Sequence, residues 1–222
     1  MQVRFETVII VAGGKGERMK SDVPKQFINL KSKPILMHTI EAFYNYNNQI
    51  DIIVVLPKAQ IEMWAELCKK YAFEINHKVV EGGSERFFSV KNGLMHAKDY
   101  GIIAVHDGVR PLVSKDTIKT CYREAESFSA VIPVVDIVES IRFVDTTGNK
   151  SVDRDKYKLV QTPQVFKAEI IKKAYLQEYT PYFTDDASVV EAIGFKIKTV
   201  QGNHENIKIT SPIDLKIAEQ II

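Results

Sequence analysis

Glycines and cations close to the N-terminus are the residues of this sequence best suited to holding phosphate. They stand in the order Gly13, Gly14, Gly16, Arg18 and Lys25. The apolar run Val8 to Ala12 precedes them and is typical of a strand that is buried on both faces. Backbone N–H groups and fixed positive charges at the end of a buried strand commonly bind polyphosphate. We therefore expect a phosphate site here, and a plain tight turn is the alternative.

The glycine loop matches neither of the two best-known nucleotide-binding motifs. A Walker loop ends in Gly-Lys-Ser/Thr, whereas Gly16 is followed by Glu17 and Arg18. The dinucleotide fingerprint requires a third glycine or alanine at the helix start, and this region of the chain carries the arginine instead. The loop therefore needs a more specific comparison.

Together with the segment Pro24-Lys25-Gln26-Phe27, the loop resembles the nucleotide loop of sugar-phosphate cytidylyltransferases, particularly the 2-C-methyl-D-erythritol 4-phosphate cytidylyltransferase family. The resemblance covers essentially the whole chain in separate blocks. These are Ala12 to Met19, Pro24 to Phe27, Glu81 to Leu94, Val105 to Pro111, Gln161 to Phe166, Thr184 to Glu191 and Asn206 to Thr210.

This resemblance implies an enzyme that transfers CMP from CTP to 2-C-methyl-D-erythritol 4-phosphate. The products would be 4-diphosphocytidyl-2-C-methyl-D-erythritol and pyrophosphate, in non-mevalonate isoprenoid biosynthesis. It also implies a homodimer in which a β-arm exchanges between subunits to complete the substrate site.

Matching motif positions also implies a role for each site residue. Arg18 and Lys25 would be catalytic and stabilise the transition state. The nucleotide would be bound by Ala12, Gly13, Gly14, Gly16, Gly82, Gly83, Ser89 and Asp107, of which Gly82, Gly83 and Ser89 line the cytosine pocket and Asp107 lies near the phosphates and the metal. The sugar phosphate would be bound by Arg154, Thr162, Thr184 and Lys208, with Arg154 reaching in from the partner's arm.

The chemistry of the reaction agrees with a site built from cations. The second pKa of a phosphate monoester is about 6, so the nucleophile is already largely ionised near neutral pH and needs no general base. The reaction needs in-line positioning and positive charge where negative charge accumulates on the α-phosphate. We expect Mg²⁺ as the cofactor, because it lowers the repulsion between the phosphates and helps the leaving group.

Three alternatives to this function stay open on the sequence. The acceptor could be ribitol 5-phosphate, whose cytidylyltransferases share the loop and the fold. The nucleotide could carry another base, because glycines and a serine select a base only through geometry. The chain could also be a non-catalytic nucleotide-binding protein that kept the fold, in which case Arg18 and Lys25 would be dispensable.

One segment departs from the family pattern. Where family members commonly carry Asp-Thr followed by a polar residue, this chain reads Asp136-Ile137-Val138-Glu139-Ser140. Ile137 cannot donate a hydrogen bond, and Glu139 would repel phosphate if it pointed inward. Ser140 or Arg142 could substitute. The departure bears on the identity of the acceptor more than on the use of CTP.

Several site residues also have plain structural interpretations. Asp107 could cap the turn after it or pair with Arg110. A hydrogen-bonding structural role suits His106 better than that of a catalytic base. Thr184 is expected to be a helix N-cap in any case. Lys208 is expected to point away from its apolar neighbours in a strand, toward solvent or the crevice, and the resemblance favours the crevice.

Length and composition exclude several other classes of protein. A chain of 222 residues suits one domain, here residues 1–222, and a net charge of +2 is too small for a nucleic-acid surface. Apolar runs stay well short of the roughly 20 residues that span a bilayer, and because the N-terminal residues lead directly into the first strand we expect no signal peptide. Cys68 and Cys121 are interpreted as small core residues, so we expect a reducing cytoplasm.

The elements that must position these residues alternate regularly. Buried strands are expected near residues 8–12, 51–56, 78–80, 101–105 and 130–134, with amphipathic helices between them. A further helix, over residues 168–179, and a strand, over residues 196–200, follow later in the chain. This order predicts an α/β fold with a Rossmann-like, doubly wound, mostly parallel sheet, whose ligands bind outside the carboxyl ends of the strands. Gly13 and Asp107 should then face the same crevice.

The alternation breaks at about residues 137–160. Apolar and polar residues alternate there around a turn at Thr147-Gly148-Asn149, which predicts a β-hairpin arm with a second extended piece from Ser151 to Val160. An isolated two-stranded arm is marginal in water, so we expect it to pack on a second subunit. A floppy surface hairpin is the alternative.

Overall fold

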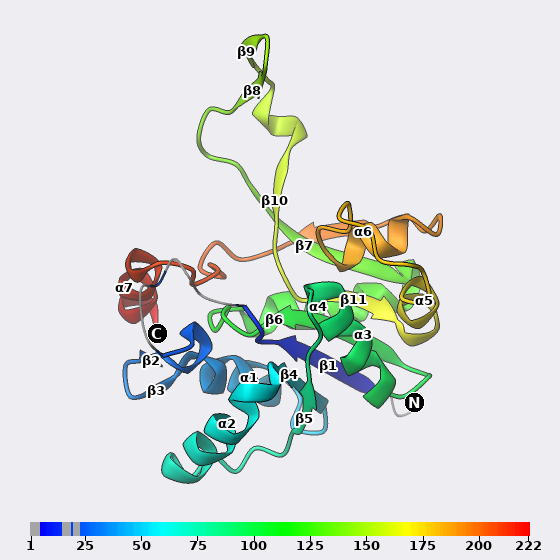
Figure 1. Ribbon diagram of the computed structural model, residues 1–222. Helices are drawn as coiled ribbons and strands as arrows, with labels where there is room; N and C mark the ends of the chain where they lie inside the picture. Colours follow the sequence, from blue (N-terminus) through cyan, green and yellow to red (C-terminus); the bar gives the residue numbers. More distant parts are fainter. Residues whose placement is uncertain (1–4, 15–18, 20–22) are drawn as a thin grey trace.

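The central element of the computed structural model, which describes residues 5–14, 19 and 23–222, is a mixed sheet of eight strands (Figure 1). Its strands follow the order β10-β7-β11-β6-β1-β4-β5, with β12 paired to β7. The strands that run parallel are β1 (Glu6–Val11), β4 (Asp51–Leu56), β5 (Lys78–Glu81), β6 (Ile102–Asp107), β7 (Ala130–Asp136) and β12 (Lys198–Gln201). Two strands run antiparallel, namely β10 (Lys158–Val160) and β11 (Gln164–Lys167).

Helices cover both faces of this sheet. One face carries α1 (Ile35–Tyr46), α2 (Lys58–Lys70) and α4 (Lys115–Phe128), and the other carries α3 (Arg86–His96), α5 (Ala168–Ala174) and α6 (Asp186–Glu191). The last helix, α7 (Pro212–Ile221), lies by the small β2 (Asn29–Leu30) and β3 (Lys33–Pro34) pair.

The middle strand β1 shows why the sheet needs both layers. Its side chains alternate between the two cores, because Val8 and Ile10 pack with α1 and α4 while Ile9 packs with α3. All three residues are fully buried, and each such side chain contributes about 1.5–3 kcal/mol to folding. The predicted doubly wound, mostly parallel α/β fold is confirmed.

The core residues include several that could have been mistaken for functional groups. Trp64 is 1% exposed, stacks on Phe27 and donates its indole N–H to His77, so it is a core residue. Burial raises the pKa of the Cys121 thiol to about 12, and that of the half-buried Cys68 to about 11. Neither thiol is ionised near neutral pH. No helix among the described residues is long and apolar enough to cross a bilayer.

Element boundaries differ from the prediction where strand and helix ends are set by tertiary contacts. β6 continues through His106 and Asp107, because both residues pair with β1, so they belong to the strand and do not follow it. Pro34 ends β3 and is the N-cap of α1. The helix expected over residues 168–179 ends at Ala174, and the strand expected from Lys196 starts at Lys198.

The predicted arm projects from the sheet at the top of Figure 1. Its hairpin consists of β8 (Arg142–Asp145) and β9 (Gly148–Ser151), which confirms the hairpin itself. The expected extended piece from Ser151 to Val160 is wrong, because a short 3₁₀ turn (Arg154–Lys156) interrupts it. Its end, β10, then pairs with β7 in the main sheet.

Candidate active site

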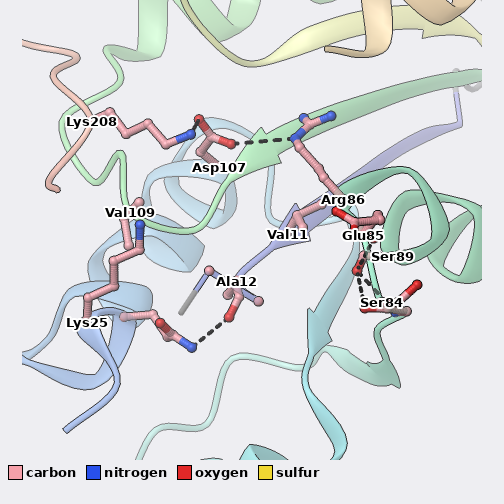
Figure 2. Close-up of a pocket in the computed structure, with 14 residues that line it drawn as sticks. Val11, Ala12, Lys25, Ser84, Glu85, Arg86, Ser89, Asp107, Val109 and Lys208 are labelled. Atoms are coloured by element: carbon pink, nitrogen blue, oxygen red, sulfur yellow. Dashed lines mark hydrogen bonds and ion pairs between the residues drawn. The ribbon is translucent and has the colours of Figure 1, made fainter. Parts of the chain in front are cut away.

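A pocket of about 280 Å³ opens at the carboxyl ends of β1 and β6, where the sequence predicts the ligand crevice (Figure 2). Figure 2 shows Lys25 on one side of it and Ser84, Glu85 and Ser89 on the other, with Asp107 and Lys208 together. It is lined by Val11, Ala12, Gly13, Gly14, Lys25, Gln26, Gly83, Ser84, Glu85, Arg86, Ser89, Asp107, Val109 and Lys208.

The glycine bend and the Lys25 side chain lie close together. A Cβ at Gly14 would lie 3.1 Å from Cε and 3.2 Å from Nζ of Lys25, so a side chain here would press on the lysine ammonium group. Lys25 begins a short 3₁₀ turn (Lys25–Phe27) after Pro24. Gly16 and Arg18, which the sequence also places in this loop, lie outside the described residues, and their roles stay predictions.

Gln26 joins this turn to the end of β1. Its Nε2 donates to the backbone carbonyl of Ala12 at 2.6 Å and to Oε1 of Gln60 at 2.5 Å, and its side chain is fully buried. These bonds fix where the chain on either side of the glycine bend can lie. Gln26 therefore holds the neighbouring Lys25 at the mouth of β1.

The opposite wall is the loop between β5 and α3. Ser89 Oγ accepts the N–H of Gly83 at 3.1 Å and donates to the carbonyl of Glu85 at 3.1 Å. A Cβ at Gly83 would come within 2.3 Å of Phe88 Cβ, so only glycine fits at this position. The hydrogen bonds of Ser89 thus fix the shape of this loop. Ser89 and Gly83 both line the pocket, whereas the adjacent Gly82 does not.

Asp107 is the centre of a cationic cluster. Its Oδ2 lies 3.0 Å from Lys208 Nζ and 3.2 Å from Arg110 Nε, and its Oδ1 lies 4.0 Å from Arg86 Nε. Burial alone would raise the pKa of Asp107, but Lys208, Arg86 and Arg110 outweigh it and hold that pKa well below its usual value. The carboxylate is therefore ionised at neutral pH.

Lys208 points toward the crevice, as the sequence predicted, although not from a strand. The segment around it has no regular secondary structure, and the N–H of Ile209 bonds to the carbonyl of Val109. The predicted pairing of Asp107 with Arg110 is also confirmed.

His106 has a structural role, as predicted, because both ring nitrogens are engaged. Nε2 donates to the carbonyl of Arg110 at 3.1 Å, which leaves Nδ1 to accept the hydroxyl of Thr162 at 3.0 Å. The Thr162 oxygen in turn accepts the N–H of Asp107 at 3.1 Å. Burial lowers the pKa of His106 to about 4, so the ring is neutral and is not placed to act as a base.

Acid should therefore weaken the fold through His106. In the unfolded state the His106 ring binds a proton below a pKa of about 6.5, whereas in the folded state it does so only near pH 4. The contribution of the neutral ring to the free energy of unfolding is therefore present at neutral pH and is lost as the pH falls. We expect this group to lower the free energy of unfolding by about 3 kcal/mol between pH 6.5 and 4.

Urea unfolding at a series of pH values measures this slope. The variant His106→Gln, which cannot titrate, should have a shallower slope, and the matched control His96→Gln, at an exposed position, should keep the wild-type slope. Equal slopes for all three proteins would contradict the assignment.

Three predicted substrate residues do not line the pocket. Thr162 is buried behind Asp107, where its hydroxyl bonds to His106. Arg154 lies on the arm and donates to the carbonyl of Val138. Thr184 is exposed, and its expected N-cap role is wrong because Asp185 is the N-cap of α6, with its side chain accepting the N–H of Ser188.

Arg86 is the main site residue that the sequence reasoning missed. Both of its terminal nitrogens bind the carboxylate of Asp186, and its Nε faces Asp107. One signal could have found it, because a cation at the first position of a helix is disfavoured by the helix dipole and so indicates a specific partner.

The pocket offers little for a protein-bound metal ion. Among the described residues no group of three or more His, Cys, Asp or Glu side chains could hold one. Asp107 and Glu85 are the carboxylates lining the pocket, and Oδ2 of Asp107 is already bound by two cations. This donor set suits a Mg²⁺ ion held mostly by substrate phosphates, with Asp107 as the nearest protein carboxylate.

A second hollow, of about 660 Å³, is larger but chemically less suited to phosphate. It lies beside α1, and its lining includes one cation, Lys33, which is paired with Glu41 at 2.5 Å. We therefore place the ligand at the carboxyl ends of the strands.

Comparison with known proteins points to a single family. The family model described as IspD, 2-C-methyl-D-erythritol 4-phosphate cytidylyltransferase, matches residues 7–222. The 2-C-methyl-D-erythritol 4-phosphate cytidylyltransferase of Phocaeicola vulgatus is 56% identical over 215 residues, which cover 97% of this chain and 98% of the relative.

Solved structures agree with this comparison. The crystal structure of 4-diphosphocytidyl-2C-methyl-D-erythritol synthase from Anaerococcus prevotii has a TM-score of 0.83 and 26% identity, over 98% of this chain and 96% of that one. The 2-C-methyl-D-erythritol 4-phosphate cytidylyltransferase structure from Francisella tularensis has a TM-score of 0.81 and 31% identity, over 98% and 100% of the two chains.

Proposed function

This chain belongs to the 2-C-methyl-D-erythritol 4-phosphate cytidylyltransferase family, and we propose that its crevice carries out that reaction with the residue roles given below. The enzyme is a nucleotidyltransferase of isoprenoid biosynthesis that transfers CMP from CTP to 2-C-methyl-D-erythritol 4-phosphate and releases pyrophosphate. The observation that supports these roles most directly is that the glycine bend and Lys25 lie close together in a pocket that also holds Lys208 and Arg86.

In this proposal the two walls of the pocket hold different parts of CTP. Ala12, Gly13 and Gly14 present backbone to the triphosphate, and Lys25 lies beside them. Gly83 and Ser89 receive the cytosine, and Gly82 lies next to them outside the pocket lining. Lys25, together with Arg18 of the same loop, stabilises the charge that develops on the α-phosphate, which is the largest contribution a site of this kind makes.

The acceptor phosphate needs attraction but no base. Lys208 and Arg110 give the Asp107 end of the pocket a positive excess, since two cations face one carboxylate within 3.2 Å. A phosphate monoester is mostly dianionic near neutral pH, and the engaged ring of His106 agrees with attack that requires no proton transfer. Mg²⁺ bound by the triphosphate and facing Asp107 would supply further charge neutralisation.

The arm supports a homodimer. Its apolar side chains are at least half exposed at Val138, Phe143, Val144, Tyr157 and Leu159. An isolated two-stranded hairpin is only marginally stable in water, and a group of exposed apolar side chains on it indicates an interaction site. We propose that they pack on a second copy of the chain, so that Arg154 of the partner subunit reaches the acceptor, with Thr162 and Thr184 close to it. The free cysteines agree with a cytoplasmic location.

A coupled pyrophosphate-release assay tests the function. We expect release with CTP and 2-C-methyl-D-erythritol 4-phosphate, and much slower release when ATP, GTP or UTP replaces CTP. Turnover of ribitol 5-phosphate alone would overturn the choice of acceptor. The comparison of acceptors matters because Ile137 and Glu139 depart from the family pattern at the start of the arm. Binding of CTP with no turnover of either acceptor would support the non-catalytic alternative.

A further inference from the structure

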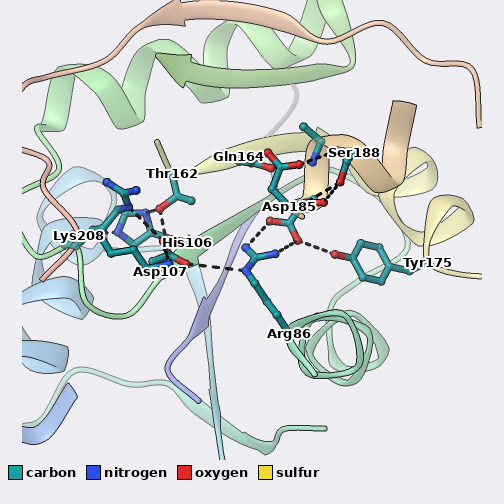
Figure 3. Close-up of polar contacts among 12 residues, drawn as sticks. Arg86, His106, Asp107, Thr162, Gln164, Tyr175, Asp185, Ser188 and Lys208 are labelled. Atoms are coloured by element: carbon teal, nitrogen blue, oxygen red, sulfur yellow. Dashed lines mark hydrogen bonds and ion pairs between the residues drawn. The ribbon is translucent and has the colours of Figure 1, made fainter. Parts of the chain in front are cut away.

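Arg86 at the start of α3 forms a bidentate contact with Asp186 at the start of α6. Figure 3 shows Arg86 facing the segment that carries Asp185 and Ser188. Nη1 of Arg86 lies 2.8 Å from Oδ1 of Asp186, and Nη2 lies 2.6 Å from Oδ2. The two residues are 100 positions apart in the sequence. Bidentate pairs of this kind are both strong and geometrically specific.

The carboxylate of Asp186 is held in place by burial and by a second hydrogen bond. Its side chain is fully buried, and Oδ1 also accepts the hydroxyl of Tyr175 at 2.6 Å. The start of α6 is in turn tied to β11, since Gln164 donates to Asp185 at 2.8 Å and accepts the N–H of Ala187 at 2.8 Å. Asp186 is thus anchored to the central sheet.

Arg86 lies where the two halves of the pocket meet. It is the first residue of α3 and directly follows the loop that ends at Glu85. Its Nε faces Asp107 at 4.0 Å, on the side of the pocket that holds Lys208. Burial opposes the charge of Arg86, but Asp186 outweighs this effect and raises its pKa, so the guanidinium is always charged.

We propose that Arg86 is a positioning residue, which Asp186 holds so that the loop Gly82 to Glu85 keeps the shape needed for the base of CTP. The terminal nitrogens of Arg86 are directed at Asp186, so they do not bind the triphosphate. The inference rests on the proposed function, because it assigns the base to this loop. It predicts that disturbing the pair weakens binding of the nucleoside part of CTP and spares binding of the phosphates.

The test compares the binding of CTP with that of inorganic tripolyphosphate, both by isothermal titration calorimetry. Arg86→Lys keeps the charge but cannot form the bidentate pair, so we expect the affinity for CTP to fall about tenfold, the effect of one charge-assisted hydrogen bond. The affinity for tripolyphosphate should stay unchanged. Asp186→Asn should show the same pattern.

Two further variants keep the test decisive if Asp186→Asn does not fold. Tyr175→Phe removes one hydrogen bond to Asp186 and should cause a smaller loss of CTP affinity, again without loss for tripolyphosphate. Arg123→Lys, in the exposed Arg123–Glu124 pair, is the matched control and should change neither affinity.

The outcomes separate this inference from the proposed function. If the unmodified protein does not turn over CTP, the proposed function fails. If it does, and Arg86→Lys either retains full CTP affinity or loses affinity for both ligands equally, then Arg86 does not position the loop and the inference alone is overturned. A selective loss of CTP affinity supports it.

Discussion

Replacing Lys25 with methionine will lower kcat for pyrophosphate release by roughly 10²- to 10³-fold, the usual cost of removing one group that stabilises transition-state charge. Methionine preserves much of the length of the side chain and removes its charge together with its N–H donors. Because the interaction strengthens as charge develops on the α-phosphate, the KM for CTP should change much less than kcat. Steady-state kinetics at saturating acceptor measures both constants.

Two controls accompany this variant. Lys25→Arg keeps a positive charge and should retain more activity than Lys25→Met, although its planar group does not reproduce the ammonium geometry. Lys58→Met removes an exposed lysine, whose side chain is 82% accessible, and should leave the kinetics unchanged. A fall in CTP affinity with an unchanged kcat would mean that Lys25 only binds the ground state.

Mixing two inactive variants should restore activity if the arm completes the partner's site. Lys25→Met and Arg154→Ala damage different residues, and in the proposed dimer one intact site forms in each mixed dimer, from Lys25 of one subunit and Arg154 of the other. With random exchange about a quarter of the sites would be intact. The regained rate is measured after the two proteins are unfolded together and refolded.

Two controls accompany this mixing experiment. Each variant refolded alone should stay far below wild-type activity. A second mixture, of Lys25→Met with Asp107→Asn, tests whether Asp107 and Lys25 belong to the pocket of one subunit. If Asp107 acts in the same subunit as Lys25, this second mixture should show no recovery. Recovery in neither mixture would contradict arm exchange between subunits.

Local pattern was sufficient for the parallel strands of the sheet, since a strand buried on both faces looks different from a half-exposed one, but it did not predict the antiparallel β10 and β11. Val8 to Val11 could be recognised because consecutive residues are apolar, and the structure shows that they alternate between two separate cores. The order of strands and helices then placed Gly13 and Asp107 at one edge, where both line the pocket.

Long-range pairing was beyond the reach of the sequence pattern. Nothing local distinguishes β10 as a strand of the main sheet from the second strand of a hairpin, because its partner β7 lies more than twenty residues earlier. Thr184 and Asp185 are both good N-cap residues, and the choice depends on which one has extended backbone before α6.

The sequence likewise predicted some residues of the candidate site and missed others. Motif positions predicted pocket-lining residues such as Gly14, Lys25, Gly83, Asp107 and Lys208. They did not identify Arg86, whose partner Asp186 comes from another element, or Gln26, whose role depends on reaching Ala12 and Gln60. Such roles appear only when the contacts are known.

A crystal structure of the protein with CTP and Mg²⁺ would show whether Lys25 reaches the α-phosphate. We expect Lys25 Nζ within hydrogen-bonding distance, about 2.7–3.2 Å, of an oxygen of the α-phosphate, with the cytosine against Gly83 and Ser89. A triphosphate bound elsewhere, or a Lys25 side chain that points away from it, would contradict the account.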